Sequence, residues 1–350
     1  MMEQPFSPVF MALAAAYPQW KLCRVVQQEK GQYRVAGNLG EQSAVVSGKF
    51  QYEAQTPSDF PAVGDYAMAD WNPGGNAVIH RILHRKSIFL RKAAGTEKSE
   101  QVVAANIDTV FLCMSLNNDF NLRRLERYLT IAWDSGATPV VVLTKADLCR
   151  DLDEKRMDVE TVLMGADLIV TSAMEQDGYR QILPCLGNGK TVAFVGSSGV
   201  GKSTLINRLL GEDRLDIGGL RNDGKGHHTT THRALLTLPG GAMVIDTPGM
   251  REIGMWDSAE GLEKAFLDVA FLARSCHFKD CTHTNEPGCA IHAALRDGVL
   301  SQERWQSYQK LLAENAYADA AQRYLAAKEK RFKDISKTNK LNRKKWEKKP

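Results

Sequence analysis

A glycine-rich stretch in the second half of the chain has the residue types that hold phosphate groups. It matches the pattern G-x-x-x-x-G-K-[ST] at each fixed position and comprises Gly196, Ser197, Ser198, Gly199, Val200, Gly201, Lys202, Ser203 and Thr204. An apolar run at 191–195 precedes it, and a helical pattern follows at 203–210. Glycines let backbone N–H groups turn toward phosphate oxygens, and a helix N-terminus adds a partial positive charge. A chance glycine turn would lack these flanking elements, so we predict a loop that binds nucleotide phosphates.

Lys202 and Ser203 are the residues of this loop from which we expect chemistry. Lys202 would neutralise the β- and γ-phosphates and so take part in catalysis. The Ser203 hydroxyl would bind Mg²⁺, a hard cation that prefers oxygen. Further along, an apolar run ends at Asp246, which suits a water-mediated contact to the same Mg²⁺. The backbone N–H of Gly249 would meet the γ-phosphate.

Two short motifs earlier in the chain predict a guanine site. The first follows an apolar run that ends at residue 143 and comprises Thr144, Lys145, Ala146 and Asp147. The Asp147 carboxylate would accept hydrogen bonds from guanine N1–H and the 2-amino group, whereas adenine has neither donor there. The Lys145 side chain would lie along the base and support the phosphate loop. The second motif is Ser172-Ala173, where a backbone N–H would meet guanine O6.

The order of these motifs along the chain is unusual. The base motifs at 144–147 and 172–173 come before the phosphate loop, whereas in most GTPases they follow it. Between 107 and 249, apolar runs alternate with helical patterns, which predicts a mainly parallel sheet with helices on both faces. Loops at the carboxyl ends of parallel strands converge on one edge whatever their order in the chain. We therefore expect the permuted motifs to form one site.

The residues expected to drive hydrolysis include an atypical one. Met250 stands after the Asp246–Gly249 motif, where many GTPases have a glutamine that orients the attacking water. Intrinsic hydrolysis should therefore be slow. His228 is the candidate to orient water and Thr230 the candidate for a further Mg²⁺ contact. The alternative is that the histidine is a solvated loop residue.

A cluster of cysteines near residue 280 predicts a metal site. Three of the seven cysteines fall within fourteen residues, and with a histidine they give the set Cys276, Cys281, His283 and Cys289. Three thiolates and one imidazole suit tetrahedral Zn²⁺ in a closed structural site. His277 or His292 could replace His283. The alternative is a set of reduced structural cysteines.

Composition and patterning predict three domains. The 350 residues are 43% hydrophobic and 25% charged, which excludes a disordered chain. Domain 1–100 would be a β-barrel, because β-rich runs fall at 23–26, 33–36, 43–50, 66–69 and 77–83 between turns. An OB-fold is the first interpretation, and an SH3-like barrel is not separated from it. Residues 101–255 would form the permuted α/β P-loop GTPase domain, and 256–350 a zinc-binding helical domain with a basic tail.

Charge is distributed unevenly along the chain. Residues 323–350 hold twelve Lys and Arg against three Asp and Glu, in a protein whose net charge is +4. Such a tail suggests contact with a polyanion, most simply RNA, and the alternative is a solubilising terminus. The basic residues between 80 and 92 would form a nucleic-acid face or a solvated surface. No apolar run reaches membrane-spanning length, and the apolar stretch at 10–17 lacks the basic flank of a secretory signal, so we expect a cytoplasmic protein without membrane contact.

The combination of a barrel region, the permuted motif order, the stretch at 227–231 and the cysteine cluster resembles the RsgA (YjeQ) family of circularly permuted GTPases. The resemblance covers nearly the whole chain. It implies an N-terminal OB-fold, structural Zn²⁺, Mg²⁺ with GTP, and hydrolysis of GTP to GDP and phosphate. It also implies stimulation by the 30S ribosomal subunit during late maturation, with contacts to 16S rRNA. We expect a monomer.

Two other functions fit parts of the sequence. The chain could be an RNA-binding protein whose nucleotide site is mainly regulatory, or a permuted GTPase of large-subunit assembly. Turnover of GTP distinguishes the first alternative. The barrel before the GTPase region and the zinc motif after it argue against the second.

Overall fold

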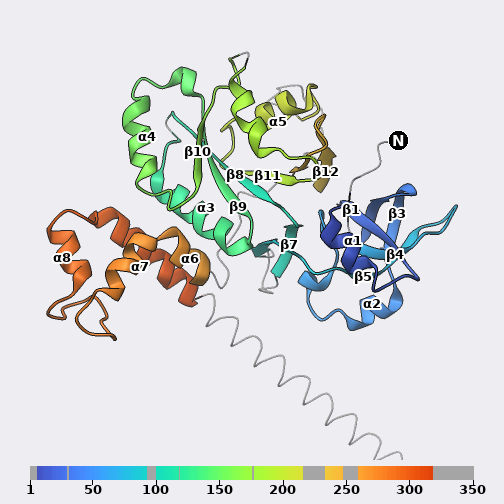
Figure 1. Ribbon diagram of the computed structural model, residues 1–350, viewed down its shortest axis with the longest axis horizontal. Helices are drawn as coiled ribbons and strands as arrows, with labels where there is room; N and C mark the ends of the chain where they lie inside the picture. Colours follow the sequence, from blue (N-terminus) through green and yellow to red (C-terminus); the bar gives the residue numbers. More distant parts are fainter. Residues whose placement is uncertain are drawn as a thin grey trace, which may run out of the picture.

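The protein was analysed as a computed structural model, in which residues 6–29, 31–92, 100–117, 119–175, 177–215, 233–246 and 259–317 are described. Three groups of elements follow one another along the chain: a strand-rich group in blue, a sheet with helices in green and yellow, and a helical group in orange and red (Figure 1). Among the helices of these residues, none combines the length and the apolar character that crossing a membrane requires.

Five strands near the N-terminus close into an OB-like barrel, as the sequence predicts. They are β1 (Lys21–Glu29), β2 (Gln32–Gly37), β3 (Gly40–Val46), β4 (Tyr66–Asp70) and β5 (Ala77–Ile82). The order β1-β2-β3-β5-β4 returns to β1, because β1 also pairs antiparallel with β4. The buried residues inside are Cys23, Val25, Tyr33, Val35, Ala44, Ala67, Ala69, Ala77 and Ile79. Helix α1 (Pro8–Ala14) packs its buried Phe10 on Tyr66, with ring centroids 3.7 Å apart.

The strand expected over 43–50 ends earlier than its composition suggests. Strand β3 stops at Val46, and Ser47 begins helix α2 (Gly48–Glu53) by accepting a hydrogen bond from the Phe50 N–H. The short 3₁₀ helix η1 (Pro57–Asp59) follows. A capping serine therefore overrides the β propensity of the residues after it.

Two of the basic residues between 80 and 92 form ion pairs within the protein. Arg85 Nη2 lies 2.7 Å from Asp65 Oδ2, and the Asp65 side chain is fully buried. Lys86 pairs with Asp108, with Nζ 2.5 Å from Oδ1. These two side chains stabilise the barrel and its junction, so they are not simply part of a solvated basic face.

A two-stranded ribbon leads from the barrel to a larger sheet. The ribbon pairs β6 (Ile88–Lys92) antiparallel with β7 (Glu100–Ala105), so it spans the boundary predicted at residue 100. The domain boundaries at 100 and 255 stay predictions. The central sheet contains β8 (Thr109–Ser115), β9 (Thr138–Thr144), β10 (Asp167–Val170), β11 (Thr191–Val195), β12 (Arg233–Thr237) and β13 (Met243–Asp246).

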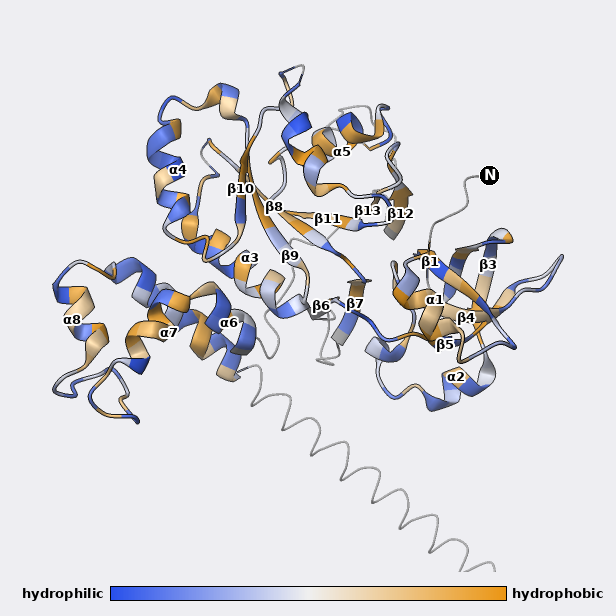
Figure 2. Cartoon of the chain, in the orientation of Figure 1, coloured by the Kyte–Doolittle hydropathy of each residue, from blue (hydrophilic) through white to orange (hydrophobic). Residues whose placement is uncertain are grey.

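The central sheet is mainly parallel, as predicted. Its order is β10-β9-β8-β11-β13-β12, with parallel pairing throughout except for the antiparallel β12–β13 hairpin. The helical elements around it are α3 (Leu122–Ser135), η2 (Ala146–Leu148), α4 (Leu152–Glu160), η3 (Gly178–Cys185) and α5 (Lys202–Leu210). Figure 2 shows the strands of this sheet largely in the colours of apolar residues.

Alternation along the strands sends apolar side chains to two separate cores. Val141 and Leu143 of β9 belong to the core that contains Leu129 of α3, whereas Val142 belongs to the core that contains Leu205 of α5. Because successive side chains of a strand point to opposite faces, this pattern requires helices on both sides of the sheet.

The barrel is joined directly to the central sheet. Strand β1 pairs antiparallel with β12, so that one 11-stranded sheet runs through both. Arg24 of β1 is buried at this junction, where its Nη2 donates to Thr191 Oγ1 at 2.6 Å and its guanidinium lies 4.7 Å from the centre of the Tyr66 ring. Burial lowers the pKa of Arg24. An isolated buried cation is unfavourable, so Arg24 needs these partners. The contacts therefore favour the arrangement of barrel and sheet in which Thr191 and Tyr66 both lie next to Arg24.

The C-terminal elements pack on helix α3. They are α6 (Ala259–Ala265), α7 (Leu267–Arg274), α8 (Ala290–Arg296) and helical residues 302–317. Glu126 of α3 is fully buried and accepts hydrogen bonds from Arg304 Nη1 at 2.9 Å and Ser307 Oγ at 2.5 Å. Arg304 also pairs with Asp268, with Nη2 2.7 Å from Oδ1. This buried network fastens the C-terminal region to the central sheet through α3.

Candidate nucleotide site and metal centre

The predicted nucleotide motifs that fall within the described residues lie at one edge of the central sheet. The base motifs follow β9 and β10, and the phosphate loop follows β11. Asp246 is the last residue of β13, whose neighbour in the sheet is β11. Because these strands are parallel, their carboxyl ends point the same way. These motifs therefore lie together in space despite their permuted order along the chain.

Close packing requires glycine at the start of the phosphate loop. A Cβ atom on Gly196 would lie 2.3 Å from the Cys113 carbonyl oxygen of β8. At the other end, Gly201 has φ 99° and begins helix α5. The Lys202 Nζ donates to the carbonyl oxygens of Gly196 at 2.8 Å and Ser197 at 2.6 Å. The ammonium group is thus held across the loop, where it can meet a phosphate oxygen.

Thr144 connects the base motif to the phosphate loop. Its Oγ1 donates to the Val200 carbonyl oxygen at 2.6 Å, and the residue is 3% exposed. This bond ties the end of β9 to the middle of the phosphate loop. The base motif and the phosphate loop are therefore joined by a direct hydrogen bond of the protein itself.

The Asp147 carboxylate is held by the second base motif. Lys145 adopts a left-handed conformation with φ 58°, and the chain then turns into η2, which carries Asp147 at the surface. The buried Ser172 donates from Oγ to Asp147 Oδ1 at 2.5 Å. The Ala146 N–H donates to the Thr171 carbonyl oxygen at 3.3 Å. These contacts bring Asp147 next to Ser172.

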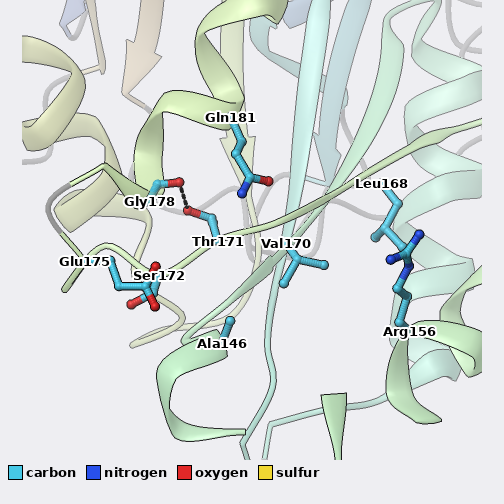
Figure 3. A pocket seen from close by; sticks show the side chains of 9 residues that line it. All are labelled: Ala146, Arg156, Leu168, Val170, Thr171, Ser172, Glu175, Gly178 and Gln181. Carbon is cyan, nitrogen blue, oxygen red and sulfur yellow. Dashed lines mark hydrogen bonds between the residues drawn. The ribbon is translucent and has the colours of Figure 1, made fainter. Parts of the chain in front are cut away.

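A cavity of about 420 Å³ adjoins this base loop along the edge strand β10 (Figure 3). Its lining residues are Ala146, Arg156, Leu168, Val170, Thr171, Ser172, Glu175, Gly178 and Gln181. Thr171 Oγ1 donates to the Gly178 carbonyl oxygen at 2.5 Å and closes one wall. Ala146 and Ser172 belong both to the cavity and to the base motifs, so the cavity borders the place expected for a base.

The four predicted metal ligands converge. One ligand atom from each of Cys276, Cys281, His283 and Cys289 lies within 4.8 Å of all the others. His283 Nδ1 is 3.5 Å from the sulfur atoms of both Cys276 and Cys289. Three sulfurs and one nitrogen at such spacing fit a tetrahedral Zn²⁺ ion. His292 instead directs Nε2 to the His283 carbonyl oxygen at 3.1 Å, which supports His283 as the ligand.

Local hydrogen bonds favour the thiolate form of one ligand. Burial acts to raise the pKa of the Cys276 thiol, but hydrogen bonds from the backbone N–H groups of Ala290 and Ile291 hold that pKa below its usual value. The Ala290 N–H lies 3.4 Å from the sulfur, at the start of helix α8. A stabilised thiolate is the form that binds zinc.

With this geometry established, comparison with known proteins identifies the family. A model of the RsgA GTPase family matches residues 82–256, half of the chain. The chain belongs to the RsgA GTPase family. It is therefore a GTP hydrolase, and its fold is the circularly permuted GTPase fold.

Named relatives of this RsgA GTPase are similar over most of the chain. A small ribosomal subunit biogenesis GTPase RsgA 2 of Lactiplantibacillus plantarum is 52% identical over 305 residues, which cover 87% of this chain and 86% of that protein. The corresponding RsgA protein of Opitutus terrae is 48% identical, over 84% and 83% of the two chains. The crystal structure of YjeQ from Thermotoga maritima superposes with a TM-score of 0.64 at 27% identity, covering 85% of this chain and 98% of that one.

Some residues predicted for this RsgA GTPase lie outside the described part of the chain. These are His228, Thr230, Gly249, Met250 and the basic tail from 323. For Asp246 the backbone is placed at the end of β13, in register with Ala234 of β12. The predictions for these residues stay predictions.

Sequence reasoning did not anticipate how the predicted residues are held. The sequence does not predict that Thr144 bonds to the phosphate loop or that Ser172 bonds to Asp147. Both are side-chain contacts between different loops, and neither has a signature in residue spacing. The parallel order of the strands was the signal that could have suggested them.

Proposed function

We propose that this chain binds the 30S ribosomal subunit, assists its late maturation, and hydrolyses GTP to GDP and phosphate faster when it is bound there. The observation that carries the proposal is the meeting of the loops after β9, β10 and β11 at one sheet edge, in a chain 52% identical to a small ribosomal subunit biogenesis GTPase. The proposal places this activity in the cytoplasm and in a monomer.

The base is recognised by the loops after β9 and β10. Asp147 accepts hydrogen bonds from guanine N1–H and the 2-amino group, and its bond to Ser172 at 2.5 Å orients the carboxylate. The backbone N–H of Ala173 meets guanine O6. Lys145 lies along the base, and Ala146 supports the turn. A site built to pair these donors discriminates against adenine, because adenine has no donors that face the carboxylate at these positions.

The phosphates are held by the loop after β11. Its backbone N–H groups and the Lys202 ammonium neutralise the phosphate oxygens at the N-terminus of α5. Mg²⁺ would supply further charge neutralisation when bound. Its proposed ligands in this chain are Ser203 and Thr230, and Asp246 would contact it through water. Residues 196–204 and Gly249 complete the proposed phosphate contacts.

Hydrolysis is proposed to depend on His228, because Met250 cannot orient water. His228→Ala should lower kcat for subunit-stimulated GTP hydrolysis by about 10²-fold, the usual contribution of a positioned acid–base group. Nucleotide affinity should stay within about twofold of wild type, because this proposal assigns His228 no ground-state contact. The two readouts are single-turnover hydrolysis and nucleotide binding. An unchanged stimulated rate would remove His228 from the mechanism.

Zinc is proposed to be structural in this protein. Cys276, Cys281, His283 and Cys289 would form a closed cage with no open position for a reacting water. The region they hold packs on α3 through Arg304 and Glu126. Zinc would therefore stabilise the C-terminal region against the GTPase sheet.

The barrel, the zinc region and the basic tail are proposed to contact 16S rRNA. The positive charge of residues 323–350 supports this assignment. The test is co-sedimentation of the purified chain with isolated 30S or 50S subunits, with a non-hydrolysable GTP analogue or GDP. We expect binding to 30S, stronger with the analogue, that weakens steeply with salt.

Two outcomes would contradict the proposal, one from this sedimentation and one from a parallel assay of GTP hydrolysis with added 30S subunits. Preferential binding to 50S would indicate a factor of large-subunit assembly. Binding to 30S without any acceleration of GTP hydrolysis would indicate an RNA-binding protein with a regulatory nucleotide site. Control sedimentation without ribosomal particles excludes aggregation.

A further inference from the structure

The segment between two of the metal ligands has no regular secondary structure. Residues 282–288 connect Cys281 to Cys289 and carry His283 between them. His283 has φ 58°, a left-handed conformation that is uncommon for residues other than glycine, although asparagine, aspartate and histidine adopt it more often than most. The ligand set must therefore rely on other contacts to hold the imidazole in place.

The Glu286 carboxylate accepts four hydrogen bonds from donors in this segment. Glu286 Oε1 accepts from the Thr282 N–H at 2.8 Å and from the Thr282 hydroxyl at 2.5 Å. Glu286 Oε2 accepts from the N–H groups of Thr284 at 2.9 Å and Asn285 at 3.1 Å. These donors lie on both sides of His283, so the carboxylate ties together the backbone before and after the ligand.

The charged form of this glutamate is strongly favoured by its surroundings. The hydrogen bonds from the Thr282 hydroxyl and from the backbone hold the pKa of Glu286 far below its usual value. The carboxylate is directed to the loop, and the four ligand atoms form their own compact set without it. Its contacts are therefore those of a residue that shapes the loop.

We propose that Glu286 is a positioning residue that preorganises the 282–288 segment so that His283 joins the three cysteines around Zn²⁺. This inference rests on the structural zinc site of the proposed function. Groups that orient metal ligands typically contribute about 10–100-fold to metal affinity. Glutamine at this position keeps the shape of the side chain but has only one acceptor oxygen. Its NH₂ group would take the place of the other carboxylate oxygen and would face backbone N–H groups donor to donor.

The test is zinc affinity of the purified full chain, measured by competition with a chromogenic chelator. Glu286→Gln should bind one zinc with about 10–100-fold lower affinity than wild type. Glu303→Gln is the matched control, because Glu303 is exposed at the start of the helical residues 302–317 and its change removes the same charge. Its affinity should equal that of wild type.

Cobalt substitution separates positioning from ligation. Co²⁺ bound to Glu286→Gln should keep the visible absorption spectrum of the wild-type site, because the ligands are unchanged. An altered ligand field would mean that Glu286 binds the metal itself, and a zinc affinity within twofold of wild type would mean that the loop does not need it. Either result overturns the proposal. A wild-type chain that binds no zinc would instead contradict the zinc site of the proposed function.

A milder variant keeps the inference testable if Glu286→Gln does not fold. Thr282→Val removes the hydroxyl that donates to Glu286 and that contacts the Thr284 hydroxyl, while the Thr282 backbone N–H donor to Glu286 remains. Its zinc affinity should fall by about tenfold, the effect of one hydrogen bond to a charged group. An unchanged affinity in this variant would contradict the role of the Glu286 network.

Discussion

Replacing Asp147 with asparagine is expected to lower the affinity for GTP by about 10³-fold or more and to create measurable affinity for xanthosine triphosphate. The asparagine amide would face the guanine 2-amino group donor to donor, whereas xanthine has a carbonyl oxygen at that position. The Asp147 side chain is held by Ser172 rather than by the core, so the change should leave the fold intact. Equilibrium binding of both nucleotides to the purified variant measures the change of preference.

The matched control is Asp153→Asn. Asp153 is an exposed residue in the first turn of α4, and its change removes the same charge from a position outside the base motifs. Its nucleotide preference should equal that of wild type. If Asp147→Asn kept the wild-type preference for GTP over xanthosine triphosphate, the base would not be recognised by this carboxylate.

The second large effect is expected for Lys202→Met, which should lower the rate of GTP hydrolysis by about 10²-fold or more. The reason is electrostatic: phosphoryl transfer depends almost entirely on positioning and charge neutralisation around the phosphates. Methionine retains the length of the side chain but lacks the ammonium group that bridges the carbonyl oxygens of Gly196 and Ser197. Single-turnover hydrolysis at saturating GTP measures the effect.

Lys190→Met is the control for the lysine prediction. Lys190 is exposed immediately before β11, at the end of the strand opposite the phosphate loop. The Lys190→Met change removes the same charge outside the phosphate loop and should leave the rate within about twofold of wild type. A Lys202→Met variant that hydrolyses GTP at the wild-type rate would exclude the assigned role of the loop.

Motifs that are local in sequence were predictable. The phosphate loop depends on glycines at fixed positions, because only they permit the close approach of Gly196 to the Cys113 carbonyl oxygen. The four metal ligands lie within fourteen residues, so their convergence needs only one loop. In both cases the chemistry restricts the residue types, and the residue types appear together in the chain.

Contacts between distant elements were not predictable from spacing. Arg24 is a charged residue within a β-rich run, where the pattern suggests a solvent-facing position, yet it is 1% exposed. Its burial depends on Thr191, 167 residues away, and on the packing of the barrel against the sheet. The antiparallel pairing of β1 with β12 is likewise a contact between distant parts of the chain, because Gln27 pairs with Ala234.

The candidate base site lies between these two cases. Parallel strand order predicts that Thr144 and the phosphate loop come together, but it does not predict that Thr144 Oγ1 bonds to the Val200 carbonyl oxygen at 2.6 Å. That bond depends on where β9 and β11 end relative to each other along the strand direction. Chain pattern determines which loops meet, and side-chain packing determines how they are joined.

The measurement that tests the central claim most directly is the rate of GTP hydrolysis by the purified chain alone, with 30S subunits and with 50S subunits. We expect slow hydrolysis by the chain alone, strong acceleration by 30S only, and no comparable turnover of ATP under the same conditions. Equal rates in the presence and absence of 30S subunits, or equal turnover of ATP and GTP, would contradict the claim.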